Sequence, residues 1–155
     1  MTEVGFYHLT RSSFQEALPR LLEKAYAAGN RVLVRVGDPE RLELLNRALW
    51  TYGKESFLPH GTRADGFADE QPIFLTTQVE NPNAATILAL VDDAPAPDLA
   101  SFVRCLDLFD GADPDTVARA RQRWRDAAAA GHNCVYWQQT ERGGWAKVGV
   151  NPPPE

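Results

Sequence analysis

The order of hydrophobic patterns in the first third of the chain limits the available folds more than any other feature. Residues 4–9 and 31–36 are short apolar runs with β-branched and aromatic side chains, which is typical of strands. Each run is followed by a segment with helical periodicity, at residues 13–28 and 38–50. Strand, helix, strand and helix in this order predict βαβ units and a mostly parallel sheet.

The remaining sequence continues this pattern after a long segment rich in Gly and Pro, residues 51–72, which is expected to be a loop. A further helix is expected from a cap at Asp113 or Asp115 to a stop at Gly131. Further strands are expected at residues 73–77, 86–91, 103–109 and 134–139. The predicted fold class is therefore α/β: a Rossmann-like three-layer sandwich with a mostly parallel central sheet and helices on both faces.

The predicted domain organisation is a single domain over residues 1–147. The segment 142–155 contains Gly143, Gly144 and a run of three prolines, so it is expected to be mobile. Residues 148–155 are expected to form a flexible C-terminal tail. No internal repeat and no second block of composition suggests another domain.

Composition indicates a globular protein with one restricted basic region. The 155 residues carry a formal net charge of −5, which disfavours broad non-specific wrapping of nucleic acid. Cys105 and Cys134 are isolated and match no metal-binding spacing, so we expect core positions in a reducing compartment. No segment resembles a signal peptide, and no apolar run approaches the ~20 residues of a membrane span. We therefore expect a cytoplasmic protein.

The basic region is the run A-R-A-R-Q-R-W-R at residues 118–125. Helical spacing places Val117, Arg121, Trp124 and Arg125 on one face. Two guanidinium groups beside an apolar ring suit a short peptide that carries an aromatic side chain and a carboxylate. Two alternatives remain: a solvated helix whose Trp124 packs on the sheet, and a site that stacks bases and binds phosphates.

A second apolar candidate lies where the second helix meets the long loop. Trp50 ends the helix, and Phe57 follows among Gly and Pro residues. Clustered aromatic side chains near a loop are typical of protein docking surfaces. The same residues could instead seal the loop onto the core.

An enzymatic alternative rests on acidic residues at the predicted strand ends. Asp92, Asp93, Asp107 and Asp110 could meet at one sheet edge and hold Mg²⁺, as in a metal-dependent nuclease. The run at residues 87–93 also resembles an apolar strand that ends in two acids, as in a degenerate nucleotide-binding protein. No glycine-rich phosphate-binding motif accompanies it. The three histidines, His8, His60 and His132, match no ligand spacing, so core or turn roles are expected for them.

Several short motifs, in order along the chain, resemble the chi subunit of bacterial DNA polymerase III holoenzyme. They cover nearly the whole sequence, to about Lys147. They are F-Y-H-L at 6–9, R-V-L-V at 31–34, A-L-W at 48–50, S-F-L-P-H-G at 56–61, D-L-F-D-G at 107–111, R-Q-R-W-R at 121–125, A-G-H at 130–132, Y-W-Q-Q at 136–139 and R-G-G-W at 142–145.

This resemblance implies a non-catalytic replisome adaptor without a cofactor, without sequence-specific DNA binding and without a membrane partner. It implies that the acidic C-terminal tail of the single-stranded DNA-binding protein binds the helix that carries Arg121, Trp124 and Arg125. Trp124 stands where other members have tyrosine, Arg125 where they have lysine, and Val117 where the family pattern is basic. The resemblance also implies a psi subunit, linking chi to the clamp loader, at Phe57 with Trp50 close by.

Overall fold

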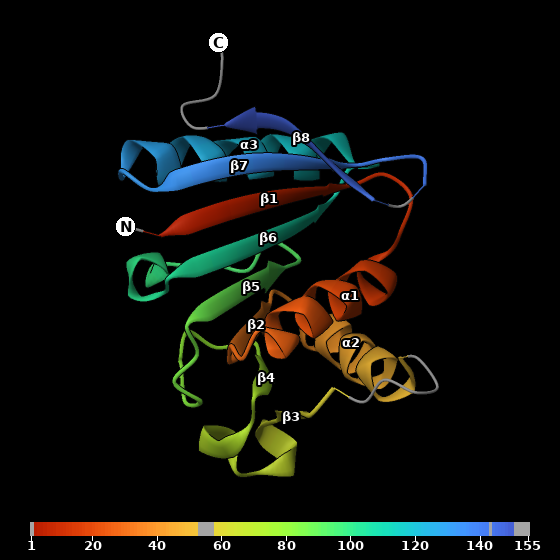
Figure 1. The fold of residues 1–155 in the computed structure, drawn as a ribbon, viewed down its shortest axis with the longest axis vertical. Helices are drawn as coiled ribbons and strands as arrows, with labels where there is room; N and C mark the ends of the chain where they lie inside the picture. Colours follow the sequence, from red (N-terminus) through yellow and green to blue (C-terminus); the bar gives the residue numbers. More distant parts are fainter. Residues whose placement is uncertain (1, 53–57, 143, 151–155) are drawn as a thin grey trace.

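A computed structural model describes residues 2–52, 58–142 and 144–150, and this part of the chain forms one eight-stranded sheet (Figure 1). The strand order is β3-β4-β2-β5-β6-β1-β7-β8. The strands are β1 (Glu3–Leu9), β2 (Val32–Val36), β3 (His60–Thr62), β4 (Ile73–Thr76), β5 (Ile87–Val91), β6 (Arg104–Asp110), β7 (Asn133–Gln139) and β8 (Trp145–Val150).

Parallel pairing dominates this sheet. Every neighbouring pair from β3 to β7 is parallel, and β8 alone runs antiparallel, against β7. β1 lies between β6 and β7, so the first strand of the chain pairs with two of the last. The mostly parallel sheet expected from the βαβ order is confirmed.

The helices cover both faces of the sheet. α1 (Phe14–Ala27) and α2 (Pro39–Thr51) pack together on one face, and α3 (Pro114–Ala129) lies behind β1 and β7 on the other (Figure 1). Asp38 and Asp113 each cap a helix that begins with proline. Proline suits the first helical position, because the amide hydrogen that it lacks would have no partner within the helix there. The predicted three-layer sandwich is therefore confirmed.

The hydrophobic core is split in two by the sheet. On the α1 and α2 face, Leu18 and Leu22 pack against the odd-numbered side chains of β1, such as Tyr7. On the α3 face, Trp124 packs with Phe6 and its neighbours. All five residues of β2 and of β5 are buried, as is usual for parallel strands covered on both faces.

Two strands lie where none was expected. β3 lies inside residues 51–72, whose high Gly and Pro content indicated a loop throughout. β8 lies inside the segment expected to be mobile and extends past the predicted domain end at residue 147. This expectation was wrong for Trp145–Val150, because β8 covers the open edge of β7 and packs Trp145 edge-on against Tyr7, with ring centroids 5.0 Å apart.

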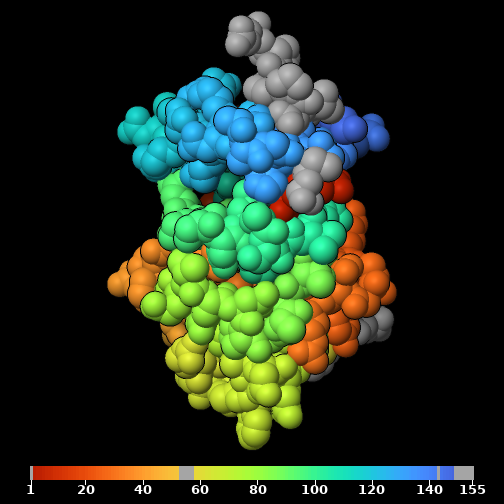
Figure 2. Space-filling view, turned by 90° about the vertical axis from the view of Figure 1, so that its left-hand side faces the viewer, coloured from red at the N-terminus to blue at the C-terminus, as the bar shows by residue number. Residues whose placement is uncertain are grey.

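The two cysteines are free thiols in the core, as expected, at 0% and 1% exposure for Cys105 and Cys134. Within the described residues, no helix has both the length and the apolar character needed to cross a membrane. Figure 2 shows the long axis of the molecule, with α3 and the C-terminal strands (blue) at one end and the segment around β3 and β4 (yellow) at the other. Trp50, whose ring lies 4.7 Å from that of His60 on β3, is therefore distant from the basic helix.

Candidate functional site

The four arginines of α3 are divided between two sides of the helix. The buried stripe of α3 is formed by Ala120, Trp124 and Ala127. At 100° per residue, Arg121 and Arg125 fall on one side of this stripe, and Arg119 and Arg123 on the other. We call these sides the Tyr136 flank and the acid-paired flank, after the neighbours described below.

On the acid-paired flank, both arginines bind carboxylates. Arg123 donates to both oxygens of Asp107, from Nε at 2.6 Å and Nη2 at 3.0 Å. Its Nη1 donates to Asp93 at 2.6 Å, and Arg119 Nε donates to the other oxygen of Asp93 at 3.0 Å. Asp107 is only 2% exposed. Burial raises the pKa of its carboxyl above the usual value, and the bonds from Arg123 offset part of that rise.

A tight turn after β5 delivers Asp93 to this flank. Asp92 and Asp93 both have positive φ, 62° and 56°, a conformation that aspartate tolerates better than most residues. The turn lies against Gly37, where a Cβ atom would meet the Asp92 carbonyl oxygen at 2.0 Å. Gly37 therefore allows the close approach that brings Asp93 within reach of α3.

On the Tyr136 flank, Arg121 and Arg125 are exposed. Within residues 2–52, 58–142 and 144–150, no ion pair involves either of them. Arg125 Nη2 donates to the side-chain oxygen of Gln122 at 2.9 Å. Two positive charges one helical turn apart are therefore available to an external anion.

Trp124 forms the floor beneath these two arginines. It is 4% exposed, and its ring lies 5.5 Å from Phe6 and 5.4 Å from Tyr136, measured between centroids. Of the alternatives stated for Trp124, the structure agrees with the one in which the ring packs on the sheet. Val117 is half-buried in the same layer and extends the floor toward the start of α3.

Two residues outside the basic run complete the flank. His8 Nδ1 and the Tyr136 hydroxyl are 2.6 Å apart, which joins the end of β1 to β7. Burial raises the pKa of the Tyr136 phenol, and the nearby Arg121 guanidinium, by charge and hydrogen bonding, offsets part of that rise. Burial and the charge of Arg121 together lower the pKa of His8. His8, Tyr136 and Arg121 therefore form one electrostatically coupled group.

Gly111 permits this arrangement. A Cβ atom there would lie 2.1 Å from the His8 ring and 2.5 Å from the Leu9 carbonyl oxygen. The interpretation of His8 as a core or turn residue missed its link to Arg121. The motifs F-Y-H-L and Y-W-Q-Q contain His8 and Tyr136, but only the pairing of β1 with β7 brings them together.

The second apolar candidate is described only in part. Trp50, in the last turn of α2, is 55% exposed, and its ring lies 4.7 Å from that of His60 on β3. Phe57 lies outside the described residues. Trp50 thus presents a large apolar surface at the end of α2.

The four acids considered as a metal site do not form one in the part of the chain that the structure describes. Asp93 and Asp107 do meet, but the cation between them is Arg123. Among the described residues, no group of three or more His, Cys, Asp or Glu side chains could hold a metal ion. This geometry weighs against the metal-dependent nuclease alternative.

The fold defines a Rossmann-like α/β protein whose α3 helix carries two exposed arginines, Arg121 and Arg125, on one flank. Comparison with known proteins identifies the family: residues 1–135 match the family model described as "DNA polymerase III chi subunit, HolC". The chain belongs to this family. It is also 35% identical over 91 residues to the "Probable DNA polymerase III subunit chi" of Rickettsia prowazekii (strain Madrid E).

That match covers 59% of this chain and 55% of the relative, so the chain spans about half the length of the curated relative.

Proposed function

We propose that this protein is a non-catalytic replisome adaptor that binds the acidic C-terminal tail of the single-stranded DNA-binding protein on the Tyr136 flank. It then links that protein to the DNA polymerase III clamp loader. Membership of the chi family supports the accessory role. The observation that carries the choice of site is the contrast within α3. Arg119 and Arg123 bind carboxylates of the protein itself, whereas Arg121 and Arg125 form no ion pair with any residue that the structure describes.

The Tyr136 flank offers the two kinds of contact that such a tail needs. The exposed guanidinium groups of Arg121 and Arg125 can each form paired hydrogen bonds with a carboxylate. The half-buried Tyr136 and Val117 offer apolar surface for an aromatic or aliphatic side chain. Trp124 acts from below, because its contacts with Phe6 and Tyr136 fix the helix and the floor in place.

The charge distribution favours a short peptide over a nucleic acid on this flank. The chain carries a net charge of −5. An extended polyanion that crossed α3 would find the two arginines of the acid-paired flank already bound to Asp93 and Asp107. A short acidic tail can be held by two arginines without leaving the Tyr136 flank. Its affinity should fall as salt is added, because the contacts are partly exposed.

Isothermal calorimetry with a peptide of the tail tests this proposal. Arg121→Ala is expected to cost about 1.5–3 kcal/mol of binding free energy, the value of a hydrogen bond to a charged group. Arg119→Ala is the matched control, because it removes the same side chain from the same helix on the acid-paired flank. Equal affinities for the Arg121→Ala variant and the unaltered protein would refute the assignment, as would an equal loss in both variants.

We further propose that Trp50 and Phe57 contribute to a second docking surface, for psi or a helicase-like factor. The exposure of Trp50 supports this choice. Affinity capture with Phe57→Ala is expected to lose the second partner and to retain the single-stranded DNA-binding protein. Loss of both partners, or of neither, would contradict the two-surface proposal.

A further inference from the structure

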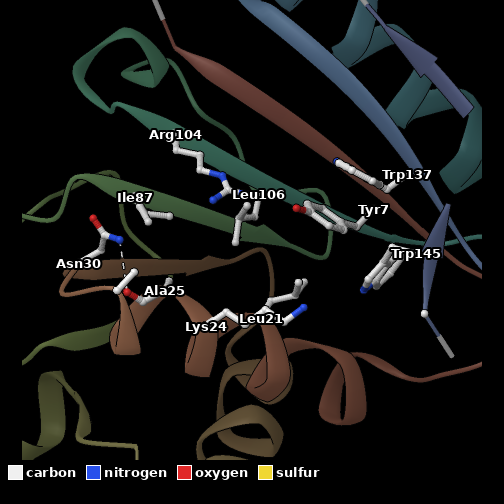
Figure 3. A pocket seen from close by; sticks show the side chains of 12 residues that line it. Tyr7, Leu21, Lys24, Ala25, Asn30, Ile87, Arg104, Leu106, Trp137 and Trp145 are labelled. Carbon is white, nitrogen blue, oxygen red and sulfur yellow. Dashed lines mark hydrogen bonds between the residues drawn. The ribbon is translucent and has the colours of Figure 1, made fainter. Parts of the chain in front are cut away.

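A cavity of about 440 Å³ lies on the face of the sheet opposite to α3 (Figure 3). α1 and α2 cover only part of this face (Figure 1). The cavity lies between the last turns of α1 and the part of the sheet formed by β6, β1, β7 and β8. Its volume falls within the range of ligand pockets in proteins, about 300–1,000 Å³. It is separate from the Tyr136 flank and from Trp50, because neither Trp50 nor any residue of that flank lines it.

One wall of the cavity is aromatic. Tyr7 and Trp137 are direct neighbours on β1 and β7, with nearly parallel rings at an angle of 15° and centroids 6.4 Å apart. Trp145 on β8 meets Tyr7 edge-on. Gly5 allows this arrangement, because a Cβ atom there would lie 2.8 Å from the Tyr7 ring. Trp137 and Trp145 are only half-buried, so part of this wall is accessible.

The rim of the cavity is positively charged. Lys24 from α1 and Arg104 from β6 line it, and both are exposed. Lys147 lies over the Trp137 ring, 6.0 Å from its centroid. The lining includes no carboxylate, and in the described part of the chain these three cations take part in no ion pair. The acidic residue of β1 is Glu3, which pairs in register with Arg104 but does not line the cavity.

Arg104 is directed toward the aromatic wall. In Figure 3 the Arg104 and Tyr7 side chains point toward each other from neighbouring strands. Burial raises the pKa of the Tyr7 phenol, and the Arg104 guanidinium, by charge and hydrogen bonding, offsets part of that rise. The cation and the rings therefore form one site rather than two separate features.

Accessible aromatic faces next to unpaired cations are the combination that binds nucleotides without sequence preference. Each base has a flat face that can stack on an aromatic side chain, and its phosphate can bind the neighbouring cation. The volume suits one nucleotide unit rather than an extended strand. We propose that this cavity binds one nucleotide unit, with the base against Trp137 and Trp145 and the phosphate against Lys24 and Arg104.

Nuclear magnetic resonance titrations with two probes test this site and identify the source of the unit. The probes are thymidine 5′-monophosphate and a thymidine oligonucleotide of about six units. The indole N–H signals of Trp137 and Trp145 are expected to shift with at least one probe, while those of Trp50 and Trp124 stay in place. Shifts with the monophosphate alone indicate a free nucleotide, and shifts with the oligonucleotide indicate a single strand.

The charge contribution is measured with Lys24→Gln and Arg104→Gln. Each lost phosphate contact is expected to reduce the slope of log affinity against log salt by about 0.7 for a single strand. Arg20→Gln is the matched control, because Arg20 is exposed one turn earlier on α1 and does not line the cavity. The same amide spectra show whether each variant is folded.

Several results would overturn the proposal. They are the absence of shifts with both probes, unchanged binding in both Lys24→Gln and Arg104→Gln, and an equal loss in Arg20→Gln. Shifts of Trp137 and Trp145 with an acidic peptide but with neither nucleotide would also overturn it. Arg121→Ala is expected to leave nucleotide binding intact, so this site and the proposed tail site can fail independently.

Discussion

The two flanks of α3 carry the same pair of side chains and differ in what surrounds them. On the acid-paired flank, Arg123 joins the helix to the sheet through a carboxylate that is 2% exposed. On the Tyr136 flank, Arg121 and Arg125 lie at the surface beside aromatic side chains. The contrast shows that a count of arginines describes neither flank, because the nearby carboxylates decide whether a guanidinium group supports the fold or is available for binding.

The difference has a simple energetic origin. A buried carboxylate such as Asp107 is costly unless a cation and hydrogen bonds compensate it. Arg123 provides the positive charge and two hydrogen bonds to Asp107, so its guanidinium group is part of the folded structure. Arg121 pairs with no buried carboxylate within the described residues, so its removal leaves no buried charge without a partner.

The largest expected effect is therefore on stability, from the acid-paired flank. Arg123→Ala should reduce the free energy of unfolding by about 3–5 kcal/mol, because Asp107 is left buried without its partner. Arg121→Ala should change it by less than about 0.5 kcal/mol. Urea denaturation of both variants at neutral pH measures the difference. The double variant Arg123→Ala with Asp107→Asn should recover part of the loss, and similar losses for Arg121→Ala and Arg123→Ala would contradict the contrast.

A smaller effect is expected from Asp93, which holds both arginines of the acid-paired flank from the turn after β5. Asp93→Asn should cost about 1 kcal/mol, because the pairs to Arg119 and Arg123 are partly exposed and Asp107 keeps its own bonds. Thermal unfolding measures this cost. A loss as large as that of Arg123→Ala would show that Asp93, rather than Asp107, is the main anchor of α3.

The contrast can also be removed by adding an acid to the Tyr136 flank. Ala118 is exposed and lies three residues before Arg121, so Ala118→Glu can place a carboxylate beside that guanidinium. A pair of this kind contributes about 0.2–0.5 kcal/mol. Together with repulsion of an acidic peptide, it should lower tail affinity about threefold, or about 0.7 kcal/mol. Ala100→Glu adds the same charge at an exposed position outside α3, beside a pocket that Arg123 also lines, and should have less effect. Calorimetry distinguishes the two.

The smallest expected effect is on the titration of His8. Burial and the charge of Arg121 lower its pKa, so an anionic peptide bound at Arg121 should raise that pKa again. By linkage, peptide affinity should then rise slightly as the pH falls through the titration of His8. Without peptide, the lowered pKa means that stability is lost as the pH falls below the ordinary value of 6.5 toward the pKa in the folded state. His8 signals in nuclear magnetic resonance spectra, recorded with and without peptide, measure the effect, and His8→Gln serves as the control for stability.

The sequence predicted the layers of the fold well, because the helices and central strands have strong periodicity and clear caps. It missed β3 and β8, which lie at the two edges of the sheet. β3 has only three residues and follows a segment rich in Gly and Pro. β8 follows two glycines, and its pairing with β7 depends on contacts that local sequence does not show.

The candidate site was predictable only in outline. Helical spacing correctly placed Arg121 and Arg125 on one face. It could not show that Trp124 is buried, because a tryptophan on a helix face suits either a core or a surface. The bonds from Arg123 to Asp107 and Asp93 join α3 to β6 and to the turn after β5, so they depend on the assembled sheet. The same is true of His8 and Tyr136, which are 128 positions apart.

The position of β1 between β6 and β7 also determines when the protein can fold. β1 pairs with strands that begin at Arg104 and Asn133, so it must wait until these much later segments have been synthesised. Such distant pairings are associated with slow folding and with a long period in which apolar strands lack partners. His8, Tyr136 and Arg121 come together only in this last step. A chain that stops before β7 would therefore lack the Tyr136 flank, which ties any binding there to the synthesis of β7.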